Sequence, residues 1–202
     1  MSNFNTPIWE LKPKLGLGEI MFGMERDAVN KLTAYGEVAV SRDSAPIPDD
    51  EATAFLRSLG FADENISGAL GAQATFASSD IITDSRNNGL VLEYERSGLT
   101  EILADVNTEH LNYRGVLVFQ HDPLAFIMHM ATSLGETPVI NESEVVFTSN
   151  CIYLFEFVVE ARTSPSSGHE YAQGNPRDRS IIWRSTPRSA GADLSLYKPM
   201  SL

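Results

Sequence analysis

The chain contains a single cysteine, Cys151, among its 202 residues. One cysteine cannot form a disulfide within the chain, and it leaves no CxxC pair for a metal or for redox chemistry. Because Cys151 begins an apolar segment, we interpret it as a small buried hydrophobic residue and not as a nucleophile. The sequence therefore predicts a fold that forms without disulfides.

Complete catalytic motifs are also missing. Gly16-Leu17-Gly18 completes neither a Walker A loop nor a GxGxxG turn, and His169-Glu170 lacks the second histidine of an HExxH zinc site. No GxSxG motif for a serine nucleophile occurs. The sequence therefore predicts no catalytic residue, no metal and no cofactor, and we interpret His121 and His129 as surface or half-buried side chains.

Long hydrophobic runs and a signal peptide are absent too. No apolar run approaches the roughly 20 residues needed to cross a bilayer. The first seven residues lack the basic and apolar regions of a secretion signal. We therefore expect a cytoplasmic protein that does not contact membranes.

Basic residues are scarce over most of the chain. Residues 1–160 carry 9 Lys and Arg against 24 Asp and Glu, residues 161–202 carry 6 against 3, and the formal net charge is −12. An acidic body repels the phosphates of nucleic acids and membranes, and it attracts basic partners. We expect a basic protein partner and no nucleic acid, although arginines are frequent near the C-terminus.

Residues 18–36 predict the unit around which the chain is organised. Ile20 and Phe22 suit a short strand, and Gly23 suits the sharp turn after it because glycine tolerates positive φ. Apolar residues then recur at helical spacing until Gly36. These positions predict one amphipathic helix with a buried stripe formed by Met24, Ala28, Val29, Leu32 and Tyr35.

A second strand–turn–helix unit is predicted over residues 115–135. Its strand ends at Phe119, Asp122 suits the helix N-cap, Pro123 suits the first helical position, and Gly135 suits the end of the helix. The second unit follows the first after about a hundred residues. Either an internal duplication or a chance match of two common units explains this repetition.

The remaining apolar segments predict strands. Residues 90–94 and 99–106 flank a turn that contains Gly98, which predicts a hairpin. Alternation places Leu90, Leu92, Tyr94, Leu99 and Leu103 on its inner face and Glu93 and Glu95 on its outer face. Residues 151–159 predict one central strand.

These elements predict an α+β fold with a mainly antiparallel sheet, in which two βα units form two related halves. We assign residues 1–110 to the first α/β half and residues 111–160 to a second α/β half packed on the first. Residues 161–202 are assigned to a C-terminal extension rich in Ser, Pro and Arg. That extension is either mobile or packs back through Ile181, Ile182 and Trp183.

Phe22-Gly23-Met24-Glu25-Arg26 resembles the turn–helix motif F-G-M-[ST]-R-x-[EQ]-V of a loose group of small bacterial α/β proteins. Glu25 stands where the motif has Ser or Thr, and Ala28 stands where an acidic residue is usual. Some proteins of this group look like immunity proteins, which bind and silence a cognate toxin. The resemblance covers residues 18–40 and implies a binding role, and it carries over no catalytic residue.

Acidic residues near loops and on the outer face of the hairpin form the candidate binding site. We predict that these residues attract a basic partner, as the acidic surfaces of some inhibitors do when they cover a cationic active site. The residues are Asp49, Asp50, Glu51, Asp63, Glu64, Glu93, Glu95 and Glu101. A solvated surface that only keeps the protein soluble explains the same residues.

Two other functional interpretations stay open at the level of the sequence. The first is an enzyme or a small-ligand-binding protein whose site lies between the two halves and uses residues such as Glu156, Tyr153 or His129. The second is an assembly module with an exposed apolar strand edge.

Overall fold

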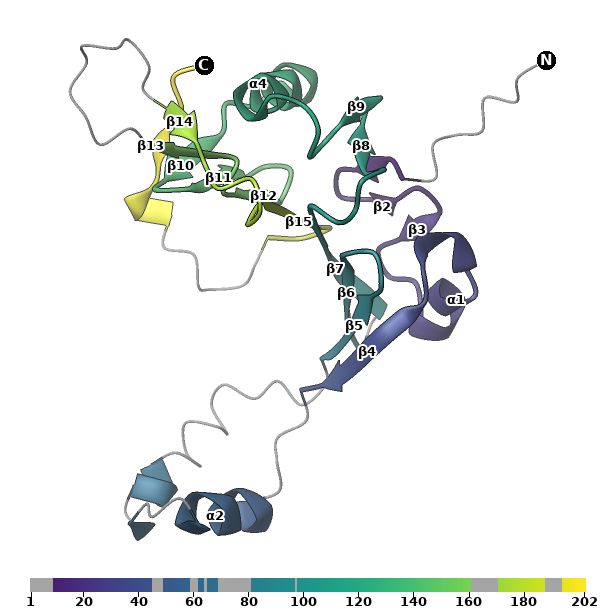
Figure 1. The fold of residues 1–202 in the computed structure, drawn as a ribbon, viewed down its shortest axis with the longest axis vertical. Coiled ribbons are helices and arrows are strands. Elements are labelled where there is room, and N and C mark those ends of the chain that lie inside the picture. Colours follow the sequence, from purple (N-terminus) through teal and green to yellow (C-terminus); the bar gives the residue numbers. More distant parts are fainter. Residues whose placement is uncertain are drawn as a thin grey trace.

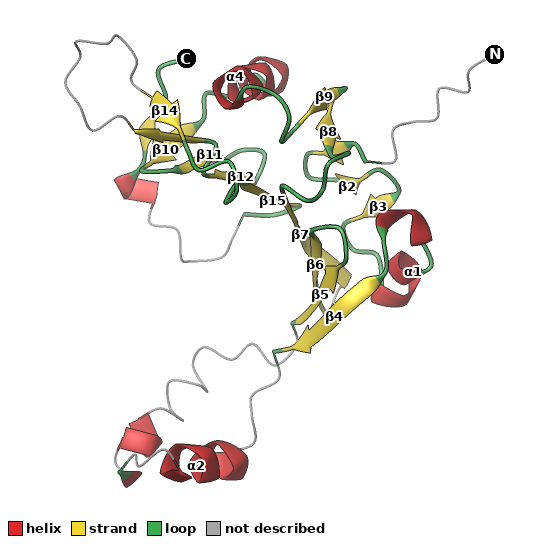
Figure 2. Ribbon diagram, in the orientation of Figure 1, coloured by secondary structure: helices red, strands yellow, loops and turns green. Residues whose placement is uncertain are grey.

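The computed structural model describes residues 9–44, 49–58, 62–63, 65–68, 81–96, 98–160, 171–187 and 194–202. Strands predominate over helices in this part of the chain (Figure 2). The helices include α1 (Arg26–Asn30), α2 (Asp49–Ser58) and α4 (Pro123–Leu134), with the 3-10 helices η1 (Thr33–Tyr35) and η2 (Leu194–Leu196). Residues 65–68 are helical as well. No described helix has the length and apolar character required to cross a membrane.

The described strands fall into one large sheet and three small ones. The large sheet contains β4 (Val38–Asp43), β5 (Ile82–Arg86), β6 (Leu90–Glu95), β7 (Gly98–Asp105), β10 (Val139–Asn141), β11 (Glu144–Phe147), β12 (Ile152–Phe155), β15 (Ser180–Arg184) and β16 (Lys198–Pro199). The small sheets contain β1 (Leu11–Lys12), β2 (Gly16–Leu17) and β3 (Ile20–Met21); β8 (Asn112–Tyr113) and β9 (Val116–Leu117); and β13 (Val158–Glu160) and β14 (Tyr171–Gln173).

The large sheet has nine described strands in the order β16-β10-β11-β12-β15-β7-β6-β5-β4 (Figure 1). Each neighbouring pair in it is antiparallel. The predicted α+β class with a mainly antiparallel sheet is therefore confirmed.

Two meanders make up most of this sheet, and they meet at their last strands. β4, β5, β6 and β7 follow α1, whereas β10, β11 and β12 follow α4 and are extended by β15. β7 and β15 then pair with each other, and Leu103 lies opposite Ile182. Each meander thus follows its own βα unit, and the sheet continues across the boundaries that we predicted at residues 110 and 160. The C-terminal extension was expected to be either mobile or packed back onto the fold. Residues 180–184 are packed, because they form β15 of the large sheet.

One face of the large sheet carries the main hydrophobic core. Val29 of α1 and Phe126 and Met130 of α4 are fully buried there, together with side chains of β1, β2, β3 and β8. Trp183 lies in the same core, and its indole Nε1 donates a hydrogen bond of 2.9 Å to the carbonyl oxygen of Gly16. The opposite face of the sheet carries a smaller cluster formed by Val146, Tyr153 and Ile182. Helices and small sheets therefore cover one face of the nine-stranded sheet.

The glycine turn after β3 docks onto the hairpin of β6 and β7. The Gly23 amide donates to the Leu99 carbonyl (2.8 Å), and the Leu99 amide donates to the Met24 carbonyl (2.9 Å). A Cβ atom on Gly98 would lie 2.4 Å from the carbonyl oxygen of Gly23, so no side chain fits at this position. The turn that the sequence singled out is therefore held by long-range backbone hydrogen bonds.

The first helix is shorter than predicted. α1 ends at Asn30, and the chain continues through η1 to Tyr35 and Gly36. Glu25 occupies the N-cap position and makes no side-chain hydrogen bond to the helix. An uncapped helix of five residues has little stability of its own, so packing of Val29 holds it in place.

The second helix begins and ends as predicted. The Asp122 carboxylate accepts a hydrogen bond of 2.9 Å from the Ala125 amide, and Pro123 occupies the first turn. Gly135 ends the helix in the left-handed conformation with φ of 65°. α4 therefore has a side-chain cap that α1 lacks.

Asp122→Ala is expected to lower the free energy of unfolding by about 1 kcal/mol, because the Ala125 amide loses its acceptor. Urea denaturation followed by circular dichroism measures this change. Asp122→Asn is the matched control, since asparagine caps helices about as well as aspartate. Equal losses in the two variants would show that the cap is not the cause.

One predicted face of the hairpin is wrong at Leu103. Tyr94 pairs with Leu99 and Glu93 pairs with Glu101, so Thr100 is an extra residue that forms a bulge. A bulge shifts the alternation by one residue. Ile102 therefore enters the main core, and Leu103 packs against the smaller cluster on the opposite face.

The single strand predicted over residues 151–159 is also wrong. β12 ends at Phe155, Glu156 has φ of 57°, and β13 begins at Val158. A residue with positive φ cannot continue a strand. The chain turns here, so that Phe157 and Val158 both enter the main core.

Candidate functional site

The structure places the predicted acidic residues in separate regions. Asp50 and Asp63 are exposed, and in Figure 1 α2 lies apart from the large sheet. The Asp63 carboxylate accepts a hydrogen bond of 2.9 Å from Nε of Arg57. Asp49 and Glu51 also belong to α2, whereas Glu64 lies outside the described residues.

Glu93, Glu95 and Glu101 lie together on the hairpin of β6 and β7. Glu93 and Glu101 are opposite each other across the two strands, an arrangement in which like charges repel. Arg184 of β15 lies next to them, with Nη1 3.2 Å from Oε2 of Glu101 and Nη2 3.7 Å from Oε1 of Glu95. Glu101 is only 9% exposed. Arg184 therefore offsets part of the negative charge of this group.

Another group of carboxylates surrounds a hollow of about 420 Å³ near the other end of the sheet. We call it the acidic hollow, and its lining residues are Glu142, Ser143, Glu156, Val159 and Glu160. Of these carboxylates, the sequence indicated Glu156 alone, as a residue of the alternative enzyme or small-ligand site, and it predicted neither Glu142 nor Glu160 as a site residue. These residues come from the β10–β11 turn, the break after β12, and β13.

Two backbone hydrogen bonds bring the parts of the acidic hollow together. The Glu160 amide donates to the Glu142 carbonyl (3.0 Å), and the Glu156 amide donates to the Ser143 carbonyl (3.1 Å). Glu142 and Glu156 have φ of 53° and 57°, which lie in the left-handed region. Residues other than Gly, Asn and Asp are uncommon there. Such strained residues are frequent at functional sites.

The electrostatics of the acidic hollow keep it negative. Hydrogen bonds from the Asn175 amide (3.0 Å) and from the Ser143 side chain lower the pKa of Glu156 below its usual range. Glu160 forms an ion pair of 2.8 Å with Lys198. Three carboxylates thus face this hollow with one lysine beside them, and Glu156 stays ionised at neutral pH.

The residues of the alternative interpretation lie on different parts of the molecule. Tyr153 belongs to the smaller cluster, whereas His129 of α4 packs on the opposite face against the ring of Tyr113. Glu156 lines the acidic hollow with a lowered pKa, and a general acid near neutral pH needs a raised one. The structure does not bring these three side chains together.

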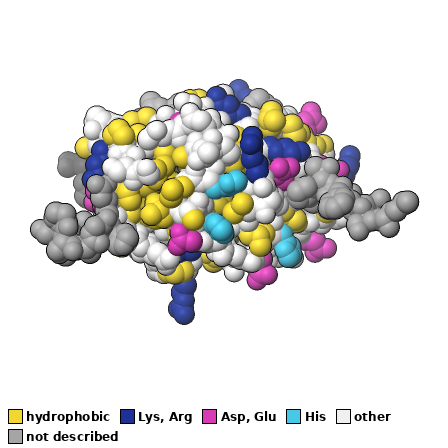
Figure 3. All heavy atoms as spheres, turned by 90° about the horizontal axis from the view of Figure 1, so that it is seen from above, with side chains coloured by type: hydrophobic (Ala, Val, Ile, Leu, Met, Phe, Trp, Pro, Cys, Tyr) yellow, Lys and Arg dark blue, Asp and Glu magenta, His cyan; other side chains and the backbone are white. Residues whose placement is uncertain are grey.

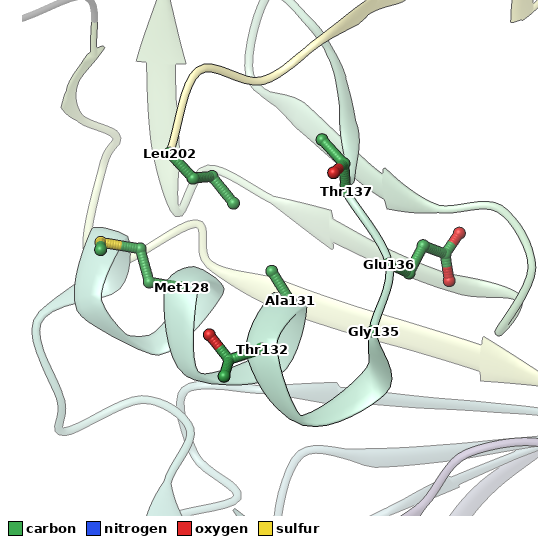
Figure 4. A pocket seen from close by; sticks show the side chains of 7 residues that line it. All are labelled: Met128, Ala131, Thr132, Gly135, Glu136, Thr137 and Leu202. Atoms are coloured by element: carbon green, nitrogen blue, oxygen red, sulfur yellow. The ribbon is translucent and has the colours of Figure 1, made fainter.

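A further hollow, of about 320 Å³, lies at the C-terminal end of α4 (Figure 4). Met128, Ala131 and Leu202 face it, whereas the Glu136 side chain points away. The two carboxylate oxygens of Glu136 accept hydrogen bonds of 2.7 Å from the Ser149 amide and from Nδ2 of Asn150. The acidic side chain beside this hollow is therefore committed to a structural turn.

Figure 3 shows the face that is at the top of the molecule in Figure 1. This face carries scattered acidic side chains among hydrophobic ones. Histidines gather near its middle.

Within the described ranges, no three His, Cys, Asp or Glu side chains are arranged to hold a metal ion. Burial raises the pKa of the Cys151 thiol, which keeps it protonated at neutral pH.

No protein-family model, no curated protein and no solved structure matches this chain. The geometry of the acidic hollow is therefore the basis for assigning a function.

Proposed function

We propose that this protein is a non-enzymatic binding protein that covers a basic surface of a protein partner. The observation that carries the proposal is the convergence of Glu142, Glu156 and Glu160 on one hollow. A guanidinium or ammonium group of the partner enters this hollow and pairs with the carboxylates. Arginine is the preferred guest, because its planar fork binds carboxylates in a bidentate manner and it is frequent at binding hot spots.

The net charge of the chain supports the same conclusion. A formal charge of −12 accelerates encounter with a cationic partner, and this effect weakens as salt screens the charges. The resemblance of the Phe22–Arg26 turn to proteins that include immunity proteins favours a toxin as the partner. We propose that this activity is cytoplasmic. The one cysteine is buried and forms no disulfide within the chain, so the fold needs no oxidising compartment.

Neutralising the acidic hollow is expected to weaken partner binding at least tenfold. The test variant is Glu142→Gln with Glu160→Gln, which leaves the hydrogen-bonded Glu156 in place. The partner is first captured from a lysate of the source organism at low salt, and its Kd for the purified variants is then measured. A tenfold loss corresponds to about 1.4 kcal/mol, within the range for removal of charges at an interface.

The matched control is Glu93→Gln with Glu95→Gln, which removes the same charge from the hairpin of β6 and β7. We expect this control to change Kd less than threefold. Equal losses in the two double variants would show that only the total charge matters. A captured partner that is acidic, or whose affinity does not change with salt, would contradict the proposal.

A further inference from the structure

A hollow of about 340 Å³ lies where β1 and β8 meet the C-terminal end of α4. We call it the Arg114 pocket. Such a volume falls within the range of about 300–1,000 Å³ that is usual for small-molecule sites. The lining combines apolar and charged side chains, among them Pro13, Leu15, Leu134, Glu10, Lys12 and Arg114.

The Arg114 guanidinium is available to a ligand. It is exposed, and it forms no hydrogen bond or ion pair with a residue in the part of the chain that the structure describes. It lies over the ring of Tyr113, with Cζ 5.8 Å from the ring centroid. That ring is fixed, because Tyr113 is only 2% exposed and its hydroxyl accepts a hydrogen bond of 2.9 Å from Oγ of Ser133. The guanidinium therefore rests on a rigid support while its N–H groups stay open to solvent.

The backbone at Arg114 does not suit an arginine. Arg114 and Gly115 connect β8 to β9, and they have φ of 49° and 81°. A two-residue hairpin turn with positive φ at both positions favours Asn-Gly, because most other side chains are strained there. Strained residues of this kind are frequent at functional sites. An arginine thus occupies a position at which asparagine would form the turn more easily.

Lys14 repeats this arrangement in the turn between β1 and β2. It lies between two lining residues, Pro13 and Leu15, and it has φ of 60°. The Leu15 amide donates to the Lys12 carbonyl (3.0 Å), and positive φ at the third position of such a turn favours glycine or asparagine. Residues 1–160 hold nine basic residues, and three of them lie in or beside the Arg114 pocket: Lys12, Lys14 and Arg114.

The charges of the lining favour a ligand with one negative charge. Among the described lining residues, Glu10 carries the one carboxylate, whereas Lys12 and Arg114 are positive. The Lys12 ammonium is partly engaged, because it donates to the Gly18 carbonyl (2.8 Å). A dianion such as phosphate is repelled more strongly by Glu10 and by the acidic body than a monoanion is. Leu15, which is 54% exposed, offers apolar surface to the rest of the ligand.

We infer that the Arg114 pocket binds a small apolar carboxylate of the fatty-acid class. The carboxylate pairs with the Arg114 guanidinium through two parallel N–H···O bonds, and the hydrocarbon chain lies on Pro13, Leu15 and Leu134. This site goes beyond the proposed function, because the Arg114 pocket shares no lining residue with the acidic hollow and selects the opposite charge.

Titration of the full chain with sodium octanoate, followed by the backbone amide signals in two-dimensional NMR, tests this inference. The signals of residues 10–15 and 113–115 are expected to shift, with a Kd on the order of 1 mM. Each further buried methylene should tighten binding about fourfold, so Kd should fall from butyrate to hexanoate to octanoate. Octylammonium and octanol keep the chain without the negative charge, and they should bind more weakly by about threefold or more.

Three results of this titration would overturn the inference. The first is the absence of shifts at residues 10–15 and 113–115 at octanoate concentrations well above the expected Kd. The second is equal binding of octanoate and octylammonium, which would show that the negative charge is not recognised. The third is a Kd that stays constant from butyrate to octanoate, which would show that the hydrocarbon chain is not bound.

Arg114→Asn removes the guanidinium and introduces the residue that the turn favours. Kd for octanoate is expected to rise by about threefold or more. The Tm of the unliganded protein should stay unchanged or rise, because asparagine tolerates positive φ better than arginine does. Arg177→Asn is the matched control, since Arg177 is an exposed arginine in the loop between β14 and β15. Equal losses in the two variants, or an unchanged Kd in Arg114→Asn, would show that Arg114 does not hold the carboxylate.

Leu15→Gln tests the apolar part of the pocket at an exposed position. It is expected to weaken octanoate binding by about threefold or more and to leave the Tm of the unliganded protein within about 2 °C. Leu196→Gln is the control, because Leu196 is an exposed leucine of η2. Glu142→Gln with Glu160→Gln should keep the full affinity for octanoate. An unchanged Kd in Leu15→Gln would overturn the fatty acid as the ligand class.

Discussion

Trp183→Ala is expected to lower the free energy of unfolding by about 3–5 kcal/mol. Trp183 is fully buried in β15, between Ile152 of β12 and Ile102 of β7. Its indole also donates to the Gly16 carbonyl, which ties the large sheet to β2. Truncation removes the packing at this junction and leaves a buried carbonyl without its donor.

Chemical denaturation of the wild type and the variant, followed by far-UV circular dichroism, measures this loss. Trp183→Phe is the matched control, because phenylalanine keeps most of the apolar volume and removes the hydrogen bond. It is expected to cost about 1–2 kcal/mol. If Trp183→Ala cost less than about 1 kcal/mol, the junction of the two meanders would not depend on this side chain.

Asp84→Ala is expected to lower the free energy of unfolding by about 3 kcal/mol, because it leaves the Arg26 and Arg86 guanidinium groups without their carboxylate. Arg26 is 36% exposed, which places the expected cost at the lower end of values for buried pairs. Asp63→Ala is the control, since the Arg57–Asp63 pair is exposed on both sides. The control should change the free energy of unfolding by less than about 0.5 kcal/mol.

The Asp84 ion pair also predicts a dependence on pH. Burial alone would raise the pKa of Asp84, but hydrogen bonds from Arg26 and Ser41 and the nearby positive charges outweigh burial and lower the pKa. A lowered pKa in the folded state stabilises the fold above the ordinary value of 3.8, and this stabilisation is lost as the pH falls below it.

The difference in Tm between the wild type and Asp84→Ala should therefore be largest above pH 5 and should shrink below about pH 3.5. A series of thermal scans between those limits tests the expectation. A difference in Tm that grows in acid would show that Asp84 is protonated in the folded protein.

Local signals in the sequence were sufficient for some elements. The limits of α4 follow from Asp122, Pro123 and Gly135, because capping depends on residues within one turn of the helix end. The glycine turn after β3 was predicted for the same reason. Its docking partner, Leu99, could not be identified, because that contact joins segments far apart in the chain.

Contacts between distant segments decide the features that the sequence did not predict. The bulge at Thr100 depends on the register between β6 and β7, and it exchanged the expected places of Ile102 and Leu103. Glu156 interrupts the apolar run only because its amide and carboxylate find partners at Ser143 and Asn175.

The candidate site also depends on contacts between distant segments. The sequence predicts a site from acidic residues that are close together along the chain. The acidic hollow instead brings together Glu142 and Glu160, whose backbones are joined by a hydrogen bond between separate segments. Charge counts alone could not show that Arg184 offsets Glu101 and Glu95, because that pairing depends on the position of β15. The total charge was predictable, and its distribution over the surface was not.

The position of β15 has a consequence for synthesis on the ribosome. β15 is one of the last strands to emerge, yet it lies between β7 and β12, which are both made earlier. Until residue 184 has left the exit tunnel, β7 and β12 each present an open edge that can pair with other chains. A nascent or truncated chain is therefore the aggregation-prone form of this protein, and insertion of β15 is a late step of its folding.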